Sequence, residues 1–137
     1  KLSQTQSWKT WTGYAFENIC LLHIHNIKAS LGIAGVQTSQ YSFMAKATDE
    51  YEGAQIDMLI DRNDNVINIC EIKFYNEEVV LTKVDAENIR KKKSIFKFIT
   101  KTKKQVFVTL ITTFGMHQSK NTLGLIDNVL TVDALFE

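Results

Sequence analysis

Three charged residues on two neighbouring segments have the types and spacing of a hydrolytic metal site. Glu71 and Lys73 lie two residues apart in the β-branched run 66–74, so both project from one face of the predicted strand. Segment 54–61 is predicted as its antiparallel partner, because a polar turn joins the two runs. Counting outward from that turn places Asp57 opposite Glu71 and on the same face. A register shifted by one residue would move Asp57 to the other face.

Two carboxylates beside one ammonium group favour a site for a divalent cation. Oxygen ligands of this kind suit Mg²⁺, which binds through one or two carboxylates, waters and substrate phosphate. The ion would lower the pKa of a bound water and neutralise charge on a phosphate under attack, and Lys73 would stabilise that charge. The alternative is a structural ion-pair network in which Lys73 bridges Asp57 and Glu71 without metal. Gln55 is assigned to the opposite strand face and given no role.

Basic residues are concentrated in one segment of an otherwise acidic chain. Although the formal net charge is +1, residues 90–104 hold half of the 16 Lys and Arg residues and no acid. Such a run is either a solvated helix face or a strip that contacts backbone phosphates. The candidate nucleic-acid contacts are Lys83, Arg90, Lys91, Lys92, Lys93 and Lys97.

The elements that must position these residues alternate between helical and strand patterns. The apolar helix predicted at 11–29 is buried on all sides and ends near Gly32. The later strand–helix–strand passage predicts a parallel pair, whereas the hairpin is antiparallel. The fold class is α/β, with a mixed sheet flanked by helices. The remaining elements expected are strands at 36–41, 54–61, 66–74, 105–112 and 129–132, a helix at 85–100 and a final helical turn at 133–137. The helix at 85–100 is expected to bury one apolar stripe, formed by Ile89, Phe96 and Ile99.

Composition limits the class of protein. A chain of 137 residues with 45% hydrophobic and 23% charged residues fits one globular domain, 1–137. No apolar stretch is long enough to cross a bilayer, and no secretory leader opens the chain. Cys20 and Cys70 lie in apolar runs and are expected to be free buried thiols, so we expect a cytoplasmic location and no membrane partner. The histidines lack the spacing of a zinc site.

The spacing from Asp57 to Glu71-Ile72-Lys73 resembles the PD-(D/E)xK nuclease signature. Glu17, in a predicted first helix, matches the further Glu that this superfamily often carries there. Ile56 stands where the proline that named the motif would be. The resemblance implies a three-layer, restriction-endonuclease-like core.

Longer phrases extend the resemblance over most of the chain. GYAFENICLLHI, GAQIDMLIDRNDNVINICEIKFY and LITTFG are similar to the C-terminal domain that follows an AAA-type ATPase module in bacterial and archaeal proteins. No phosphate-binding G-x-x-x-x-G-K-[ST] motif occurs here, and the chain begins with Lys1. The resemblance therefore implies that the domain is the C-terminal part of a longer chain with a linked ATPase as partner.

The resemblance also implies a role for each site residue. Asp57 and Glu71 would ligate Mg²⁺, for which Mn²⁺ could substitute, with the Ile72 carbonyl as a further ligand. Glu17 would be an outer ligand or orient a metal-bound water, and Lys73 would position that water. The expected activity is phosphodiester hydrolysis, with DNA as the substrate and a homodimer as a common arrangement. The alternative is a non-catalytic module that binds nucleic acid or docks onto the ATPase.

Overall fold

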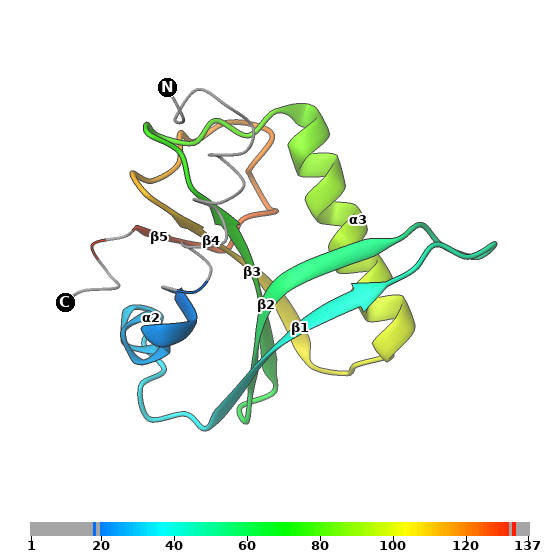
Figure 1. Cartoon of the computed structure of the whole chain (residues 1–137), viewed down its shortest axis with the longest axis horizontal. Coiled ribbons are helices and arrows are strands. Elements are labelled where there is room, and N and C mark those ends of the chain that lie inside the picture. Colours follow the sequence, from blue (N-terminus) through cyan, green and yellow to red (C-terminus); the bar gives the residue numbers. More distant parts are fainter. Residues whose placement is uncertain (1–17, 19, 132, 134–137) are drawn as a thin grey trace.

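The protein forms a five-stranded mixed sheet with helices on both faces, as a computed structural model shows for residues 18, 20–131 and 133 (Figure 1). The α/β class and the order of the described elements confirm the prediction from sequence. The elements are α2 (Ile24–Ser30), β1 (Thr38–Ala45), β2 (Ala54–Arg62), β3 (Val66–Lys73), α3 (Lys83–Thr100), β4 (Gln105–Thr112) and β5 (Asn128–Thr131).

The strands lie side by side in the order in which they occur in the chain. β1, β2 and β3 are antiparallel, whereas β3, β4 and β5 are parallel. Helix α3 makes the crossover that a parallel β3–β4 pair requires. The predicted antiparallel hairpin and the predicted parallel pair are both present.

The two faces of the sheet carry separate apolar clusters. On one face, Ile27 of α2 packs with Met58 and Cys70. On the other, Phe96 of α3 packs with Leu59 and its neighbours. Figure 1 shows α2 and α3 on opposite sides of the sheet. Because side chains alternate along a strand, Cys70 faces α2 while its neighbour in sequence faces α3.

Helix α3 begins at a residue whose side chain suits that position. The Thr82 hydroxyl accepts a hydrogen bond from the Asp85 amide, and the Asp85 carboxylate accepts one from the Thr82 amide. This capping box satisfies free amides of the first turn and starts the helix two residues before the predicted position. The helix ends at Lys101, which has a left-handed φ of 52°. The buried side chains of α3 include Ile89 and Phe96, as predicted.

The first helix differs from its prediction. Residues 18 and 20–22 are helical, a turn interrupts the helix at His23, and α2 follows. Leu21 and Leu22 are 48% and 78% exposed, so the prediction that this helix is buried on all sides is wrong. The helix packs by one side only, through residues such as the fully buried Cys20. Residues 11–17 and 19 of the prediction lie outside the described residues.

Other boundaries differ by a few residues. Strand β1 occupies Thr38–Ala45 rather than 36–41. Gly32 has a φ of 76° directly after α2, a conformation that glycine adopts without steric cost, so the predicted helix end is confirmed. Of the final turn predicted at 133–137, only residue 133 is described, and residue 132 is also outside the described part.

Both cysteines are buried thiols outside any disulfide, as predicted. They lie on the α2 side of the sheet, where Cys70 is fully buried. Burial raises the pKa of the Cys70 thiol well above its usual range, and nearby Cys20 and Glu71 act in the same direction. Cys70 therefore stays a neutral thiol in the folded protein.

Within the described residues, no helix has the length and apolarity needed to cross a membrane.

Candidate functional site

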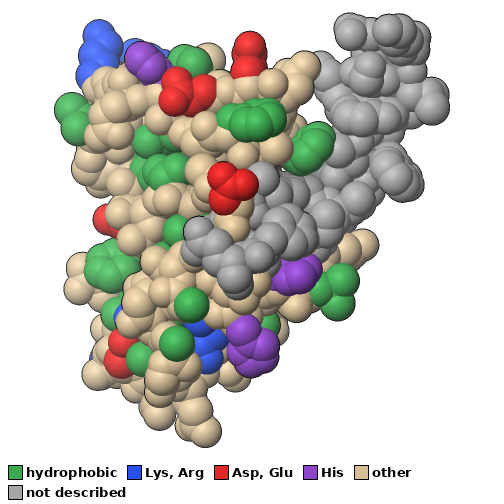
Figure 2. Space-filling model, turned by 90° about the vertical axis from the view of Figure 1, so that its left-hand side faces the viewer, with side chains coloured by type: hydrophobic (Ala, Val, Ile, Leu, Met, Phe, Trp, Pro, Cys, Tyr) green, Lys and Arg blue, Asp and Glu red, His purple; other side chains and the backbone are tan. Residues whose placement is uncertain are grey.

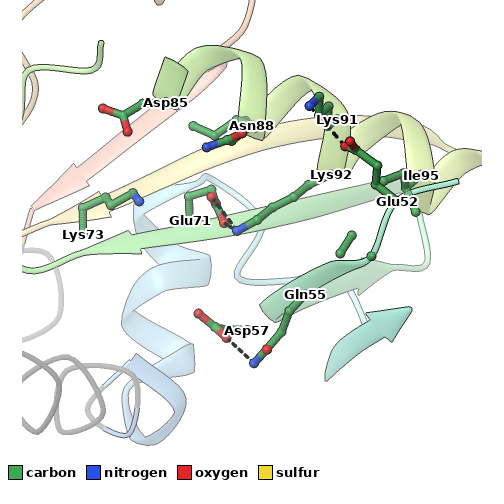
Figure 3. Close-up of a pocket in the computed structure, with 13 residues that line it drawn as sticks. Glu52, Gln55, Asp57, Glu71, Lys73, Asp85, Asn88, Lys91, Lys92 and Ile95 are labelled. Atoms are coloured by element: carbon green, nitrogen blue, oxygen red, sulfur yellow. Dashed lines mark hydrogen bonds and ion pairs between the residues drawn. The ribbon is translucent and has the colours of Figure 1, made fainter. Parts of the chain in front are cut away.

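A cavity of about 510 Å³ lies between α3 and the ends of β2 and β3 (Figure 3). Asp57, Glu71 and Lys73 all line it, so the fold brings three of the four residues predicted for catalysis to one place. The other lining residues are Glu52, Gly53, Ala54, Gln55, Asp85, Asn88, Ile89, Lys91, Lys92 and Ile95.

The register of the β2–β3 hairpin is the one predicted from the turn. Met58 faces Cys70 and the pairing continues regularly to the turn. The predicted register is therefore confirmed from the turn to this pair. The regular pairing stops there, one residue before Asp57 and Glu71, and the two acids are related by lining the same cavity.

A bulge in β2 lies at the site. Tyr41 of β1 pairs with Leu59, but Phe43 pairs with Ile56, so Asp57 and Met58 together stand opposite a single β1 residue. Such bulges reorient one side chain and occur often next to active sites. The bulge explains how Ile56 and Leu59, three residues apart, both pack on the α3 side of the sheet.

Gln55 belongs to the cavity, which contradicts its assignment to the opposite face. Its amide nitrogen donates a hydrogen bond to Asp57 Oδ1 at 3.2 Å. Residues two apart on a strand share a face, so the spacing alone should have placed Gln55 beside Asp57. The interaction fixes the Asp57 carboxylate from one side and leaves its second oxygen without a hydrogen bond to the described residues.

Glu71 is the buried carboxylate of the site. It is 5% exposed, and its two oxygens accept hydrogen bonds from Lys92 Nζ at 3.1 and 3.2 Å. Lys92 comes from the middle of α3 and reaches down into the cavity (Figure 3). A lysine predicted to contact nucleic acid is therefore the ion partner of a predicted metal ligand.

Lys73 does not form the metal-free ion-pair network that was the alternative to a metal site. In that network Lys73 bridges Asp57 and Glu71, but the Lys73 ammonium makes no ion pair with any described residue. Figure 3 shows the side chain extending along the cavity toward Glu71. Lys92 is the ion partner of Glu71 instead, so the alternative in which Lys73 bridges the two acids is not the arrangement in the structure.

The donor chemistry of the cavity fits a hard divalent ion. Asp57 and Glu71 supply carboxylate oxygens, the donors that Mg²⁺ prefers when waters complete its shell. No group of three or more acidic, His or Cys side chains is placed for metal binding among the residues that the structure describes. The Ile72 side chain packs on the α2-side cluster, so only its main chain could contribute. Glu17 lies outside the described residues.

The other candidate nucleic-acid contacts divide into two groups. Lys91 lines the rim of the cavity, where its ammonium lies 3.1 Å from Glu52 and both side chains are exposed. The rest do not line the cavity and make no ion pair within the described part of the chain: Lys83, Arg90, Lys93 and Lys97.

Comparisons with protein-family models, curated proteins and solved structures found no match. The case for a function therefore depends on the cavity and on the pattern of residues around it.

The sequence contained a signal for cavity residues on α3 that its interpretation missed. Asp85, Asn88 and Lys92 recur at intervals of three and four, which places them on one face of a helix. Ile89 and Phe96, predicted as the buried stripe, bracket Lys92 at the same intervals. The sequence interpretation grouped the three lysines at 91–93 in one basic strip, although Lys91 and Lys92 line the cavity and only Lys92 pairs with Glu71.

Proposed function

We propose that this domain is a Mg²⁺-dependent nuclease with a restriction-endonuclease-like core, which hydrolyses phosphodiester bonds of DNA. The observation that carries the proposal is the convergence of Asp57, Glu71 and Lys73 on one cavity beside a β-bulge. Charged residues are rare so close to a sheet interior unless they have partners or a role. Here one acid is buried and the nearby lysine has no described partner.

The site residues would have two roles, which are binding of the metal ion and stabilisation of charge on the phosphate. Asp57 and Glu71 would hold the ion, and Gln55 would orient Asp57 through its hydrogen bond. A bound Mg²⁺ activates water and neutralises phosphate charge. Lys73 would place its ammonium, which has no ion partner among the described residues, against the phosphate, where a fixed positive charge stabilises the developing negative charge.

The basic residues of α3 would hold the nucleic-acid backbone next to the cavity. Lys91 lies at its rim, and Arg90 and Lys97 are exposed on the same helix. Contacts of this type neutralise phosphates and carry no base specificity. On the face that Figure 2 shows, which includes α2, Lys and Arg side chains are few and scattered. The α3 side is therefore the better candidate for the approach of the substrate.

A cleavage assay tests the proposal. Purified protein is incubated with Mg²⁺ and labelled single-stranded, double-stranded and branched DNA. Cleavage by the natural chain should be lost in Asp57→Asn and Glu71→Gln. Asp64→Asn is the matched control, because Asp64 lies on the same hairpin but outside the cavity and pairs with Arg62. Cleavage that persists in Asp57→Asn would contradict the proposed role.

A second candidate is a nuclease-like module that binds nucleic acid without cutting it. The direct Lys92–Glu71 ion pair favours it, because such a pair satisfies the buried acid without any metal. A module of this kind should keep its affinity for DNA when Asp57 is changed to Asn. It should also bind equally well with EDTA and with Mg²⁺, whereas the nuclease should bind its substrate more tightly with the ion.

A further inference from the structure

One ammonium group engages both oxygens of the most buried carboxylate in the site. Lys92 Nζ lies 3.1 and 3.2 Å from the two oxygens of Glu71, whose side chain is 6% exposed. A divalent cation bound to Glu71 would need at least one of these oxygens. The lysine and the metal therefore compete for the same acceptor.

We propose that Lys92 is a displaceable internal cation that couples metal binding to phosphate binding. This inference rests on the proposed function, because it assumes that Glu71 is a metal ligand. Without substrate, Lys92 occupies Glu71 and weakens metal binding. A substrate phosphate that enters the cavity draws the ammonium away and leaves Glu71 available to the ion.

The position of Lys92 suits such an exchange. Both side chains line the cavity, but that of Lys92 is 30% exposed and that of Glu71 only 6%, so Lys92 is the more accessible member of the pair. Lys73 lines the same cavity with no ion partner among the described residues. An incoming phosphate would thus meet two ammonium groups, one already free and one exchangeable. Electrostatic attraction to the phosphate would offset the loss of the contact with Glu71.

Lys91 provides a matched control on the same helix. It also forms a lysine–glutamate pair at 3.1 Å and also lines the cavity. The side chains of Lys91 and Glu52 are 57% and 70% exposed, however, and an ion pair between such exposed groups contributes little to stability. Removing Lys91 changes the net charge by the same amount but leaves Glu71 occupied.

The test is a calorimetric titration of Mn²⁺ into the whole chain and its Lys92→Met and Lys91→Met variants. We expect Lys92→Met to bind Mn²⁺ roughly tenfold more tightly than the natural chain, the equivalent of one charged hydrogen bond removed from competition. Lys91→Met should bind Mn²⁺ alone as tightly as the natural chain does. Thymidine 5′-monophosphate should increase Mn²⁺ affinity in the natural chain by a larger factor than in Lys92→Met, because its phosphate completes the ion's shell in both but displaces Lys92 only in the natural chain.

The outcomes separate this inference from the proposed function. If the natural chain binds no Mn²⁺ with or without the nucleotide, the metal site and the coupling both fail. If it binds Mn²⁺ and Lys92→Met binds no more tightly, only the coupling fails, and Lys92 is a structural partner of Glu71. Should Lys92→Met not fold, Lys92→Gln removes the charge and keeps a hydrogen-bond donor. An unchanged Mn²⁺ affinity in Lys92→Gln would then overturn the inference.

Discussion

Two hollows lie at opposite ends of strand β2, and each contains a lysine paired with an acid. At the end of β2, a cavity of about 390 Å³ includes Asp61, Arg62 and Lys104. Lys104 Nζ donates to Asp61 at 2.6 Å and to the Arg62 carbonyl at 2.8 Å. Arg62 in turn pairs with Asp64 and donates to the buried Asn68. Every charged group of this hollow has a partner from the chain.

The cavity near the start of β2 differs in what it leaves unsatisfied. Lys73 has no ion pair with the described residues, and Asp57 has a single amide donor. In its Lys92–Glu71 pair the acid is 6% exposed, compared with 31% for Asp61 in the Lys104–Asp61 pair, whereas the two lysines are similarly exposed. A fully paired set of charges needs no ligand, whereas an incomplete set retains binding capacity. The contrast identifies the cavity near the start of β2 as the functional candidate and the hollow at the end of β2 as structural.

The largest expected difference between the two hollows is in catalysis. Glu71→Gln should lower the rate of DNA cleavage by roughly a hundredfold or more, because it removes a charged ligand at the reacting phosphate. Asp61→Asn should leave the rate per folded molecule within about twofold. The two hollows lie at opposite ends of β2, and salt screens the charges of one from the other. Rates measured at saturating Mg²⁺ check both. Equal losses in the two variants would remove the distinction.

The next difference is in stability. Lys92→Met should lower the free energy of unfolding by about 3 kcal/mol, because it leaves the buried Glu71 carboxylate unpaired. Lys104→Met should cost about 1 kcal/mol, because Asp61 is exposed enough to be hydrated. Urea denaturation measures both. Mn²⁺ should restore much of the stability of Lys92→Met and none of that of Lys104→Met.

A smaller effect concerns the surface around the cavity. Lys97→Met should weaken DNA binding about equally for all sequences and reduce the slope of log affinity against log salt by about one. Lys104→Met is the comparison, because its ammonium is already committed to Asp61. Fluorescence anisotropy at several salt concentrations gives both slopes. An unchanged slope in Lys97→Met would place the substrate elsewhere.

The smallest effect is a pH dependence from the opposite face of β3. The pKa of the buried Cys70 thiol is raised in the folded state, so the unfolded thiol ionises first as pH rises. The unfolded state then binds fewer protons, and stability should fall above about pH 8.5, the range where a free thiol ionises. Cys70→Ala should show a shallower decline between pH 8.5 and 10 in thermal melts. Identical slopes would show that Cys70 is not responsible.

Much of the fold and part of the site could be predicted from local sequence. The polar turn before Val66 predicted the hairpin register as far as Met58 and Cys70, next to the two candidate acids. Apolar periodicity located α3 and its buried stripe. The Gln55 error came from misapplying the strand period and not from missing information. The β2 bulge had no such local signal, because it depends on how β1 pairs with its neighbour.

The pairing of Lys92 with Glu71 could not be predicted from sequence, because it depends on the tertiary structure. The two residues are 21 apart in sequence, and their contact depends on how α3 crosses the sheet. A run of like charges does not show which member turns inward. The interval to Ile89 and Phe96 could have singled out Lys92, but burial of a lysine is unexpected until its acid partner is known.

The most direct test of the metal site is a titration of Mn²⁺ into the natural chain and into Asp57→Asn, both with thymidine 5′-monophosphate present. The nucleotide supplies the phosphate that such sites often need to complete the ion's shell. Binding to the natural chain that is lost in Asp57→Asn, with Asp64→Asn unaffected, is the result expected of a metal-dependent nuclease. Absence of binding in the natural chain, or equal binding in Asp57→Asn, would contradict it.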